Sequence, residues 1–230
     1  MDKRLKYSYA EKKEQSRRVF AVFIYLLVFF VLYVSFTSFI FSMRNMGSDS
    51  MQPGIHAGDR FIFSSYLLYS AELQRGSIVL LDIEAGNQRD LFEVVLDGFI
   101  RFFTLQQVSI SKRGSGLYIK RVIALPGDEV SMTNFVMRVK PKDSPYQGTE
   151  FEISEKYYDV TIPQVSALWD ESLPFHANMD TLVVGENECF LLSDDRSNTN
   201  DSRNWGPVPI SRIKGRALFR YWPLTRIGVP

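Results

Sequence analysis

A serine in a tight turn lies near the N-terminal end of the chain, soon after a long apolar run. The turn reads GSDSMQPG over residues 47–54 and contains Ser50. The Pro-Gly pair at its end forces an extended or turning backbone. The Ser50 hydroxyl is therefore a candidate nucleophile, but a serine needs a neighbouring base to take its proton.

Few side chains in this sequence are candidates for that base. The chain has two histidines, His56 and His176, which share no metal-ligand spacing, and a Ser-His-Asp triad would have to use one of them. A lysine in an apolar setting is the better candidate, and Lys120 lies in the segment GLYIKRVIALPGD. Burial disfavours the ammonium form and lowers the pKa, so a buried Lys120 is partly neutral near neutral pH.

The direction of the Lys120 side chain follows from strand alternation. On a strand, Lys120 shares a face with Tyr118 and Val122. Arg121 points the other way, together with Ile119. One of the two adjacent cations is therefore turned into apolar surroundings. The alternative is a lysine whose apolar stem lies along the protein while its ammonium reaches water.

A third unusual stretch, residues 191–209, is rich in Asp, Asn, Ser and Arg and reads LLSDDRSNTNDSRNWGPVP. Its spacing fails the EF-hand pattern, because no glycine lies at the required place and no glutamate closes the loop. A solvated turn is one interpretation. We expect instead a structural role, in which Asp–Arg pairs hold the loop in place.

The elements that must position these residues begin with a membrane anchor. Val19 to Phe41 contains no charged residue over 23 positions. A helix of that length covers about 34 Å, slightly more than a hydrocarbon core of ~30 Å. A cleaved signal peptide has a shorter apolar region of ~7–15 residues and a small-residue cleavage site, and neither is present. The sequence therefore predicts a retained transmembrane helix.

Charge predicts the orientation of this helix. Residues 1–18 carry seven Lys and Arg residues against three acidic ones, whereas the segment just beyond the apolar run offers a single Arg44. By the positive-inside rule the N-terminus is cytoplasmic. No later segment is as long and uncharged, so we expect one crossing, with the rest of the chain on the outer side.

From Gly58 onward the sequence is typical of a β protein, because short runs of branched and aromatic residues alternate with turn signals. It predicts a mainly β fold, in which a single N-terminal transmembrane helix is followed by an antiparallel β-rich ectodomain. The expected strand segments are DRFIFSSY, GSIVLLDI, LYIKRVIAL, FVMRVK, YYDVTI, TLVVGENECFLL and GRALFRYW.

Residues 89–107, RDLFEVVLDGFIRFFTLQQ, differ from the rest of the ectodomain. Their apolar side chains recur at spacings of one, three and four, which favours an amphipathic helix. This helix either packs on the domain core or lies on the membrane surface, which its aromatic content suits.

Bulk composition argues against other classes of protein. A net charge of +1 gives no electrostatic basis for binding nucleic acid. The one cysteine, Cys189, excludes an internal disulfide and a Cys-based metal cluster, and its apolar setting is typical of a core thiol. We expect no cofactor and no metal.

Three motifs behind an N-terminal anchor together resemble the type I (leader) signal peptidases, the S26 family of Ser/Lys serine proteases. The motifs are SDSMQPG, YIKRVIALPGDEV and SDDRSNTNDSRNWGPVP, and the flanking AGDRFIF, RGSIVLL and GRALFRYWPLTRIG agree. The resemblance is weak around 82–116 and 131–180, which we expect to be insertions. The expected organisation is a cytoplasmic N-terminus (1–18), a transmembrane helix (19–41) and an extracytoplasmic catalytic domain (42–230).

The resemblance implies a role for each matching position. Ser50 is the acylating nucleophile and Lys120 is its general base. The Ser50 backbone N–H and the Ser48 hydroxyl stabilise the oxyanion. Thr199 stands where the family has a serine that orients the lysine amine. The other implied site residues are Asp201 and Arg203, which support the site, and Met51, Ile55, Tyr118 and Ile119, which line shallow substrate pockets.

Some positions depart from the family pattern. Asp49 bears most directly on the chemistry, because a carboxylate near a developing oxyanion is unfavourable unless it turns outward. The other departures are Gly54, Ser77, Ala124, Asp195 and Ser193, the last of which stands where the family has a glycine.

The resemblance implies a membrane-bound serine endopeptidase that cleaves N-terminal signal peptides from exported preproteins with a Ser/Lys dyad. Its expected partners are preproteins, the lipid bilayer and the secretion translocon, and not nucleic acid. Its expected location is the bacterial cytoplasmic (inner) membrane, with the catalytic domain on the outer face.

Two other functions compete with this one. Self-cleaving regulators of the LexA type share the Ser/Lys chemistry, but they carry DNA-binding helices and no anchor. The other alternative is a catalytically impaired, membrane-tethered β module that binds exported peptides or envelope partners.

Overall fold

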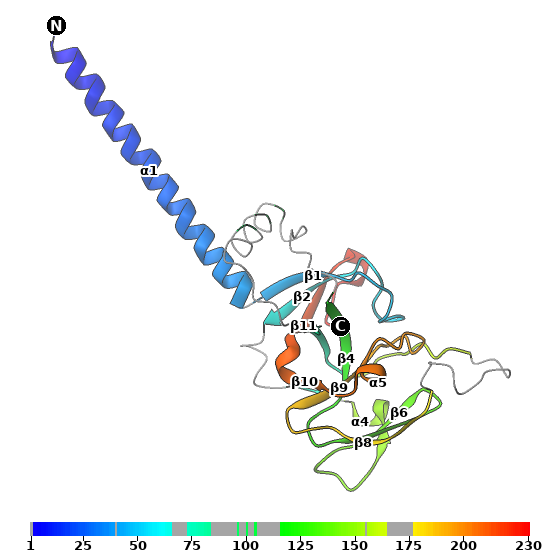
Figure 1. Cartoon of the computed structure of the whole chain (residues 1–230). Coiled ribbons are helices and arrows are strands. Elements are labelled where there is room, and N and C mark those ends of the chain that lie inside the picture. The colour runs from blue at the N-terminus through cyan, green and yellow to red at the C-terminus, as the bar shows by residue number, and fades with distance from the viewer. Residues whose placement is uncertain are drawn as a thin grey trace.

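The computed structural model describes residues 2–39, 41–65, 73–83, 96, 100, 104, 116–154, 156–164 and 177–230. One long N-terminal helix leads into two antiparallel sheets (Figure 1). This arrangement confirms the predicted fold class, a mainly β protein behind an apolar helix.

Helix α1 (Asp2–Phe39) projects away from the sheets (Figure 1). Its segment Glu11–Tyr33 is long and apolar enough to cross a membrane, and nearly all apolar side chains from Val19 to Leu32 are exposed. The helix starts well before the expected anchor, because the charged residues ahead of Val19 are good helix formers with helix-stabilising pairs such as Glu14–Arg18. The apolar helix thus has the properties of a membrane anchor.

The larger sheet has seven strands in the order β1-β2-β11-β3-β4-β9-β10. Its inner strands β3 and β9 are mostly apolar and β4 carries two buried cations, because both faces of the sheet are covered. Strand β11 approaches β2 so closely that a Cβ on Gly215 would lie 2.0 Å from the Ser64 carbonyl oxygen. The strands are β1 (Phe41–Asn45), β2 (Arg60–Ser65), β3 (Ile78–Asp82), β4 (Leu117–Ala124), β9 (Glu188–Leu192), β10 (Val208–Pro209) and β11 (Ile213–Trp222).

The smaller sheet has four strands in the order β7-β6-β5-β8. Its apolar side chains pack against Ile123 of β4 and against Phe190 and Leu192 of β9, so one core joins the two sheets. Its elements are β5 (Glu129–Thr133), β6 (Val136–Lys140), β7 (Gly148–Thr149), β8 (Met179–Val183) and the adjoining helix α4 (Glu150–Ile153).

Short helical turns complete the described part of the chain. Helix α5 (Ser202–Trp205) follows the polar loop, η1 (Ile210–Arg212) precedes β11, and η2 (Leu224–Arg226) follows it.

Two segments differ from the expected elements or fall outside the described residues. YYDVTI is not a strand: Thr161 makes an isolated bridge to Asp195, and the residues around it are irregular. Its backbone groups thus pair with the polar loop rather than with a sheet. The amphipathic segment 89–107 lies outside the described residues, apart from Leu96, Ile100 and Thr104.

Candidate active site

The turn that carries Ser50 is closed by its own backbone. The Met46 N–H donates to the Asp59 carbonyl, and the Gly58 N–H donates back to the Met46 carbonyl. Inside this loop the Gln52 N–H donates to the Asp49 carbonyl (3.0 Å), so Ser50 lies in a tight turn as the sequence predicted. The Ser50 side chain is buried, and the Ser48 hydroxyl donates to Ser50 Oγ at 3.2 Å.

The carboxylate of Asp49 is turned to solvent, whereas the Ser50 side chain is buried. The carboxylate accepts a hydrogen bond from the Ala57 N–H (2.9 Å) on the outer side of the turn. That hydrogen bond, aided by one from the Gln52 side chain, lowers the pKa of Asp49 and keeps it ionised. The Asp49 carboxylate therefore helps to close the turn. It points outward, which is the arrangement that leaves the oxyanion position without a nearby negative charge.

Strand β4 places Lys120 and Arg121 on opposite faces. Lys120 and Tyr118 both contact Trp205, with Lys120 Nζ 6.0 Å from the Trp205 ring centroid. Arg121 instead donates to both carboxylate oxygens of Asp194. Strand alternation predicts one buried cation, whereas the structure buries both, and Asp194 neutralises Arg121.

Among the residues that the structure describes, Lys120 has no comparable ion pair, and its protonation reflects this. Its side chain is 1% exposed, and the resulting loss of hydration lowers the pKa to about 8. Asp201, Asp194 and Asp195 oppose this shift through their charges, whereas Arg203 adds to it. Burial is therefore the dominant cause, as the apolar sequence around Lys120 predicted.

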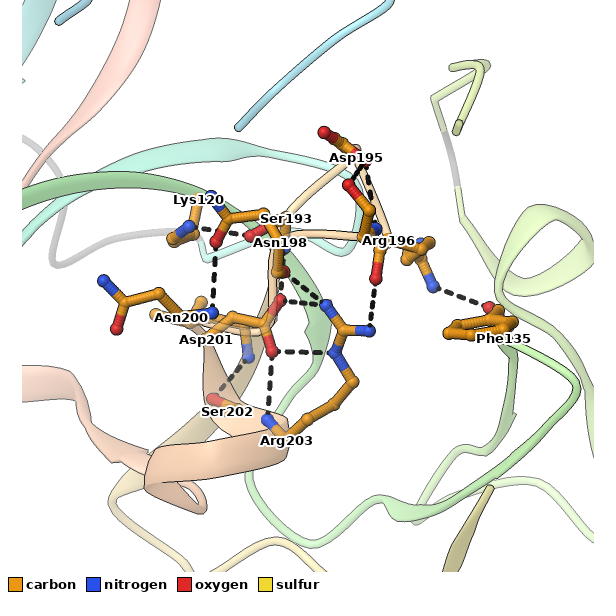
Figure 2. A network of polar contacts seen from close by, with 12 residues as sticks. Lys120, Phe135, Ser193, Asp195, Arg196, Asn198, Asn200, Asp201, Ser202 and Arg203 are labelled. Atoms are coloured by element: carbon orange, nitrogen blue, oxygen red, sulfur yellow. Dashed lines mark hydrogen bonds and ion pairs between the residues drawn. The ribbon is translucent and has the colours of Figure 1, made fainter. Parts of the chain in front are cut away.

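The polar loop after β9 is held by ion pairs. Asp201 accepts from Nε and Nη2 of Arg203, and its Oδ2 also accepts from the Ser193 N–H at 3.0 Å (Figure 2). Burial raises the pKa of Asp201, but the hydrogen bonds and charge of Arg203 outweigh it and leave that pKa lowered. The expected Asp–Arg pinning of the loop is confirmed.

A second ion pair fixes the loop from below. The Arg196 guanidinium donates to Glu150 and to the Phe135 carbonyl, and the Tyr158 hydroxyl donates to the same carboxylate of Glu150. Arg196 and Glu150 are both fully buried. The loop is thus tied to the smaller sheet as well as to β4.

The loop brings the serine turn and the lysine strand together. Lys120 Nζ donates to Ser193 Oγ at 2.7 Å, as Figure 2 shows. Two residues further on, the Asp195 N–H donates to the Ser50 carbonyl at 3.1 Å. Residues 193–195 are therefore one short segment that contacts both the candidate nucleophile and the candidate base.

In this state the nucleophile and the base do not bond to each other. Within the described part of the chain, Ser50 Oγ bonds to Ser48 and Lys120 Nζ bonds to Ser193. Catalytic hydrogen bonds commonly tighten only when substrate binds. The arrangement has the parts for acyl transfer, namely a turn-borne hydroxyl, a second hydroxyl beside it and a desolvated amine.

The predicted pocket residues divide between two apolar clusters. Met51, Ile55 and Ile119 lie in one cluster beneath the serine turn. Tyr118 packs in the other, against Trp205. Thr199 lies half-buried in the polar loop, where its carbonyl accepts from the Asp201 N–H.

The two remaining candidates have other surroundings. His56 lies on the serine turn, where its ring Nδ1 is 2.6 Å from Arg226 Nη1. Cys189 is a buried core thiol, and burial raises its pKa to about 12. His176 lies outside the described residues.

Sequence reasoning missed two residues that the structure places at the site. Ser193 was noted only as a departure from the family pattern, yet it bonds to the lysine. Glu150 carries no sequence signal, since it is one of several acids in a weakly matching region and its partner Arg196 is 46 residues away. Both contacts are long-range and leave no local trace in the sequence.

Comparison with known proteins agrees with this geometry. Residues 17–222 match the family described as "Signal peptidase, peptidase S26". The chain is 29% identical to "Probable signal peptidase I-1" of Synechocystis sp. over 203 residues, which cover 88% of this chain and 82% of that protein. It is 30% identical to "Signal peptidase I" of Bacillus caldolyticus over 176 residues, which cover 73% of this chain and 84% of that protein.

A plant protein is similar over a shorter region. "Probable thylakoidal processing peptidase 2, chloroplastic" of Arabidopsis thaliana is 30% identical over 112 residues, which are 49% of this chain and 24% of that protein. The family match runs from the apolar helix to the last long strand, and it includes the serine turn, the lysine strand and the polar loop. The chain belongs to the signal peptidase family, peptidase S26, and is a serine endopeptidase of the signal peptidase I type.

Proposed function

We propose that this enzyme cleaves N-terminal signal peptides from exported preproteins with Ser50 as nucleophile and Lys120 as general base. The observation that carries the assignment is the segment 193–195, which contacts the Lys120 amine on one side and the Ser50 carbonyl on the other. A serine in a closed turn and a lysine with a pKa of about 8 are thereby attached to one short piece of chain.

The chemistry follows from these groups. The neutral Lys120 amine takes the Ser50 proton as Oγ attacks the scissile carbonyl, and the resulting ammonium protonates the leaving amine. The amine then activates a water that hydrolyses the acyl-enzyme. The Ser50 N–H and the Ser48 hydroxyl stabilise the oxyanion, and the present contact between Ser48 and Ser50 Oγ places this hydroxyl beside the reacting oxygen.

The remaining site residues hold the polar loop in place or line the substrate pockets. Asp201 and Arg203 hold the loop that carries Ser193, and Thr199 supplies a second hydroxyl in that loop. The substrate docks as an extended strand, with backbone hydrogen bonds for affinity and shallow pockets for small side chains at −1 and −3. Those pockets are lined by Met51, Ile55, Tyr118 and Ile119.

We further propose that the enzyme is a single-pass protein of the bacterial cytoplasmic membrane. The basic N-terminal residues face the cytoplasm, and the catalytic domain, residues 42–230, faces the outer side. Lipid bilayer and translocon are then its immediate neighbours, and preproteins reach it as they emerge from the membrane.

The assignment is tested with the full chain in detergent and a preprotein whose signal peptide ends with alanine at −1 and −3. Wild type should cleave, whereas Ser50→Ala and Lys120→Met should not. Ser131→Ala and Lys140→Met are matched controls, since Ser131 also precedes a methionine and Lys140 is a half-exposed strand lysine. Cleavage by Ser50→Ala would refute the nucleophile.

The same experiment separates the enzyme from a peptide-binding module. A wild type that binds the preprotein without cutting it, with affinity unchanged in Ser50→Ala, would favour the catalytically impaired module instead.

A further inference from the structure

The Lys120 amine has a hydrogen-bond partner that the family pattern does not provide. Ser193 Oγ accepts from Lys120 Nζ at 2.7 Å (Figure 2). The resemblance places a glycine at this position, which has no side chain to bond with. The hydroxyl beside the base is therefore a feature of this chain.

The Ser193 hydroxyl is held rigidly. The residue is fully buried and directly follows β9. Its N–H donates to Asp201 Oδ2, and Asp201 is itself fixed by the Arg203 guanidinium. A side chain with one rotatable bond on such a fixed backbone is a well-defined acceptor, because few atoms are free to move.

A general base needs its lone pair aimed at the proton it removes. A neutral lysine amine carries two N–H bonds and one lone pair, and it rotates about its last C–N bond. When one N–H donates to a fixed hydroxyl, that rotation is restricted and the lone pair has a defined direction. Because the Asp195 N–H ties the Ser50 backbone to the same segment, the direction is set relative to the nucleophile.

We propose that Ser193 is a positioning residue, whose hydroxyl accepts a hydrogen bond from the Lys120 amine and directs the amine lone pair toward Ser50. This inference rests on the proposed function. It assigns to Ser193 the orienting task that the resemblance gives to Thr199, whose side chain makes no hydrogen bond to the residues that the structure describes.

Replacing Ser193 changes the hydrogen bonding of the Lys120 amine without changing the charges around it. The charged groups that act on Lys120 are Asp194, Asp195, Asp201 and Arg203, and the Trp205 ring covers the amine. Replacing Ser193 by alanine removes one oxygen and leaves all of them. A hydroxyl binds an ammonium more strongly than a neutral amine, so its loss lowers the pKa of Lys120.

The test is the pH dependence of preprotein cleavage by the full chain in detergent, with kcat and KM measured from pH 6 to 10. In Ser193→Ala we expect kcat on the alkaline plateau to fall about 10- to 100-fold with KM little changed. The acidic limb should move to lower pH by about 0.5–1 unit. Ser193→Thr, which keeps a hydroxyl, should restore both.

Three further variants serve as controls for this experiment. Thr199→Val should shift the limb by less than half as much as Ser193→Ala, and Ser131→Ala should match wild type. A Ser193→Ala enzyme with wild-type kcat and limb, or an equal or larger shift in Thr199→Val, would overturn the inference. Ser50→Ala tests the proposed function separately. If Ser50→Ala still cleaves, Ser50 is not the nucleophile and the proposed function fails, whatever Ser193→Ala shows.

The thermal unfolding temperature of Ser193→Ala shows whether a loss of activity comes from a folding defect. If Ser193→Ala unfolds at the wild-type temperature and still shows the two effects, positioning is supported. If Ser193→Ala is folded but has a low kcat, and Ser193→Thr has an equally low kcat, the hydroxyl is not the cause and the inference is refuted.

Discussion

Replacing Lys120 by methionine should abolish cleavage and at the same time stabilise the fold. Methionine keeps the length of the side chain without its amine, and Lys120 is almost completely buried. A lysine that served only structure would give the opposite sign, because its removal would leave a cavity or an unpaired partner. The stability of this single variant therefore reports on why the amine is buried.

The magnitude follows from the pKa. Burial lowers the pKa of Lys120 from 10.5 to about 8 in the folded protein. At 1.36 kcal/mol per unit this shift costs about 3 kcal/mol of folding free energy below pH 8. The variant also loses the hydrogen bond to Ser193, about 1 kcal/mol, so the net gain at pH 7 is about 2 kcal/mol.

The sign of the pH dependence is fixed by linkage. Between pH 8 and 10.5 the unfolded chain binds more protons at this lysine than the folded chain, so wild-type stability rises with pH in that window. The advantage of Lys120→Met should therefore be largest at pH 7 and shrink as pH approaches 10.

Thermal unfolding of the full chain in detergent at pH 7 and pH 10 measures this. We expect an increase in Tm of about 5 °C at pH 7 for Lys120→Met. Lys140→Met, at a half-exposed site, is the control and should change Tm little. A lower Tm for Lys120→Met at pH 7, or a gain that stays constant with pH, would refute the reasoning.

Three other outcomes are expected. Ser48→Ala should lower kcat about 100- to 1000-fold with KM nearly unchanged, in a steady-state cleavage assay, because it removes the proposed oxyanion donor; a wild-type kcat would contradict that role. In wild type, kcat/KM should rise about tenfold per pH unit up to about pH 8 and then level off, since the neutral Lys120 amine is the proposed base; a rise that continues through pH 10 would show an unperturbed lysine. Asp49→Asn should keep kcat/KM within about threefold of wild type, because the carboxylate is turned to solvent and its oxygen still accepts from Ala57; a large gain in kcat would show that the charge opposes the oxyanion.

Local patterns in the sequence were sufficient for much of this architecture. The alternation around Lys120 depends only on the two-residue period of a strand, and the structure confirms that Lys120 and Tyr118 meet Trp205 while Arg121 faces Asp194. The pairing of Asp201 with Arg203 was equally accessible, because the two residues lie two positions apart at the start of one short helical turn.

Long-range contacts were not accessible in the same way. Arg121 and Asp194 are 73 residues apart, and so are Lys120 and Ser193. No local period links such residues, so the burial of both cations and the identity of the lysine's partner depend on how β4 and β9 pair. The register Arg121 opposite Leu192 brings these side chains together, and only the folded sheet supplies it.

The start of the first strand was hidden for a different reason. Phe41 is apolar and follows the apolar run without a break, so hydropathy assigned it to the anchor. The structure ends the helix at Phe39 and begins β1 at Phe41, where pairing with Ser64 of β2 replaces helical hydrogen bonds.

The abrupt passage from α1 to β1 has a consequence for how substrates are found. Ten residues lie between Phe39 and Ser50, so at most about 40 Å of extended chain joins the end of the helix to the proposed nucleophile. A preprotein whose own apolar segment sits in the same bilayer shares that thin layer, and the search becomes two-dimensional. High local concentration then replaces tight recognition, so brief, weak contacts with two small side chains are enough to select a cleavage point.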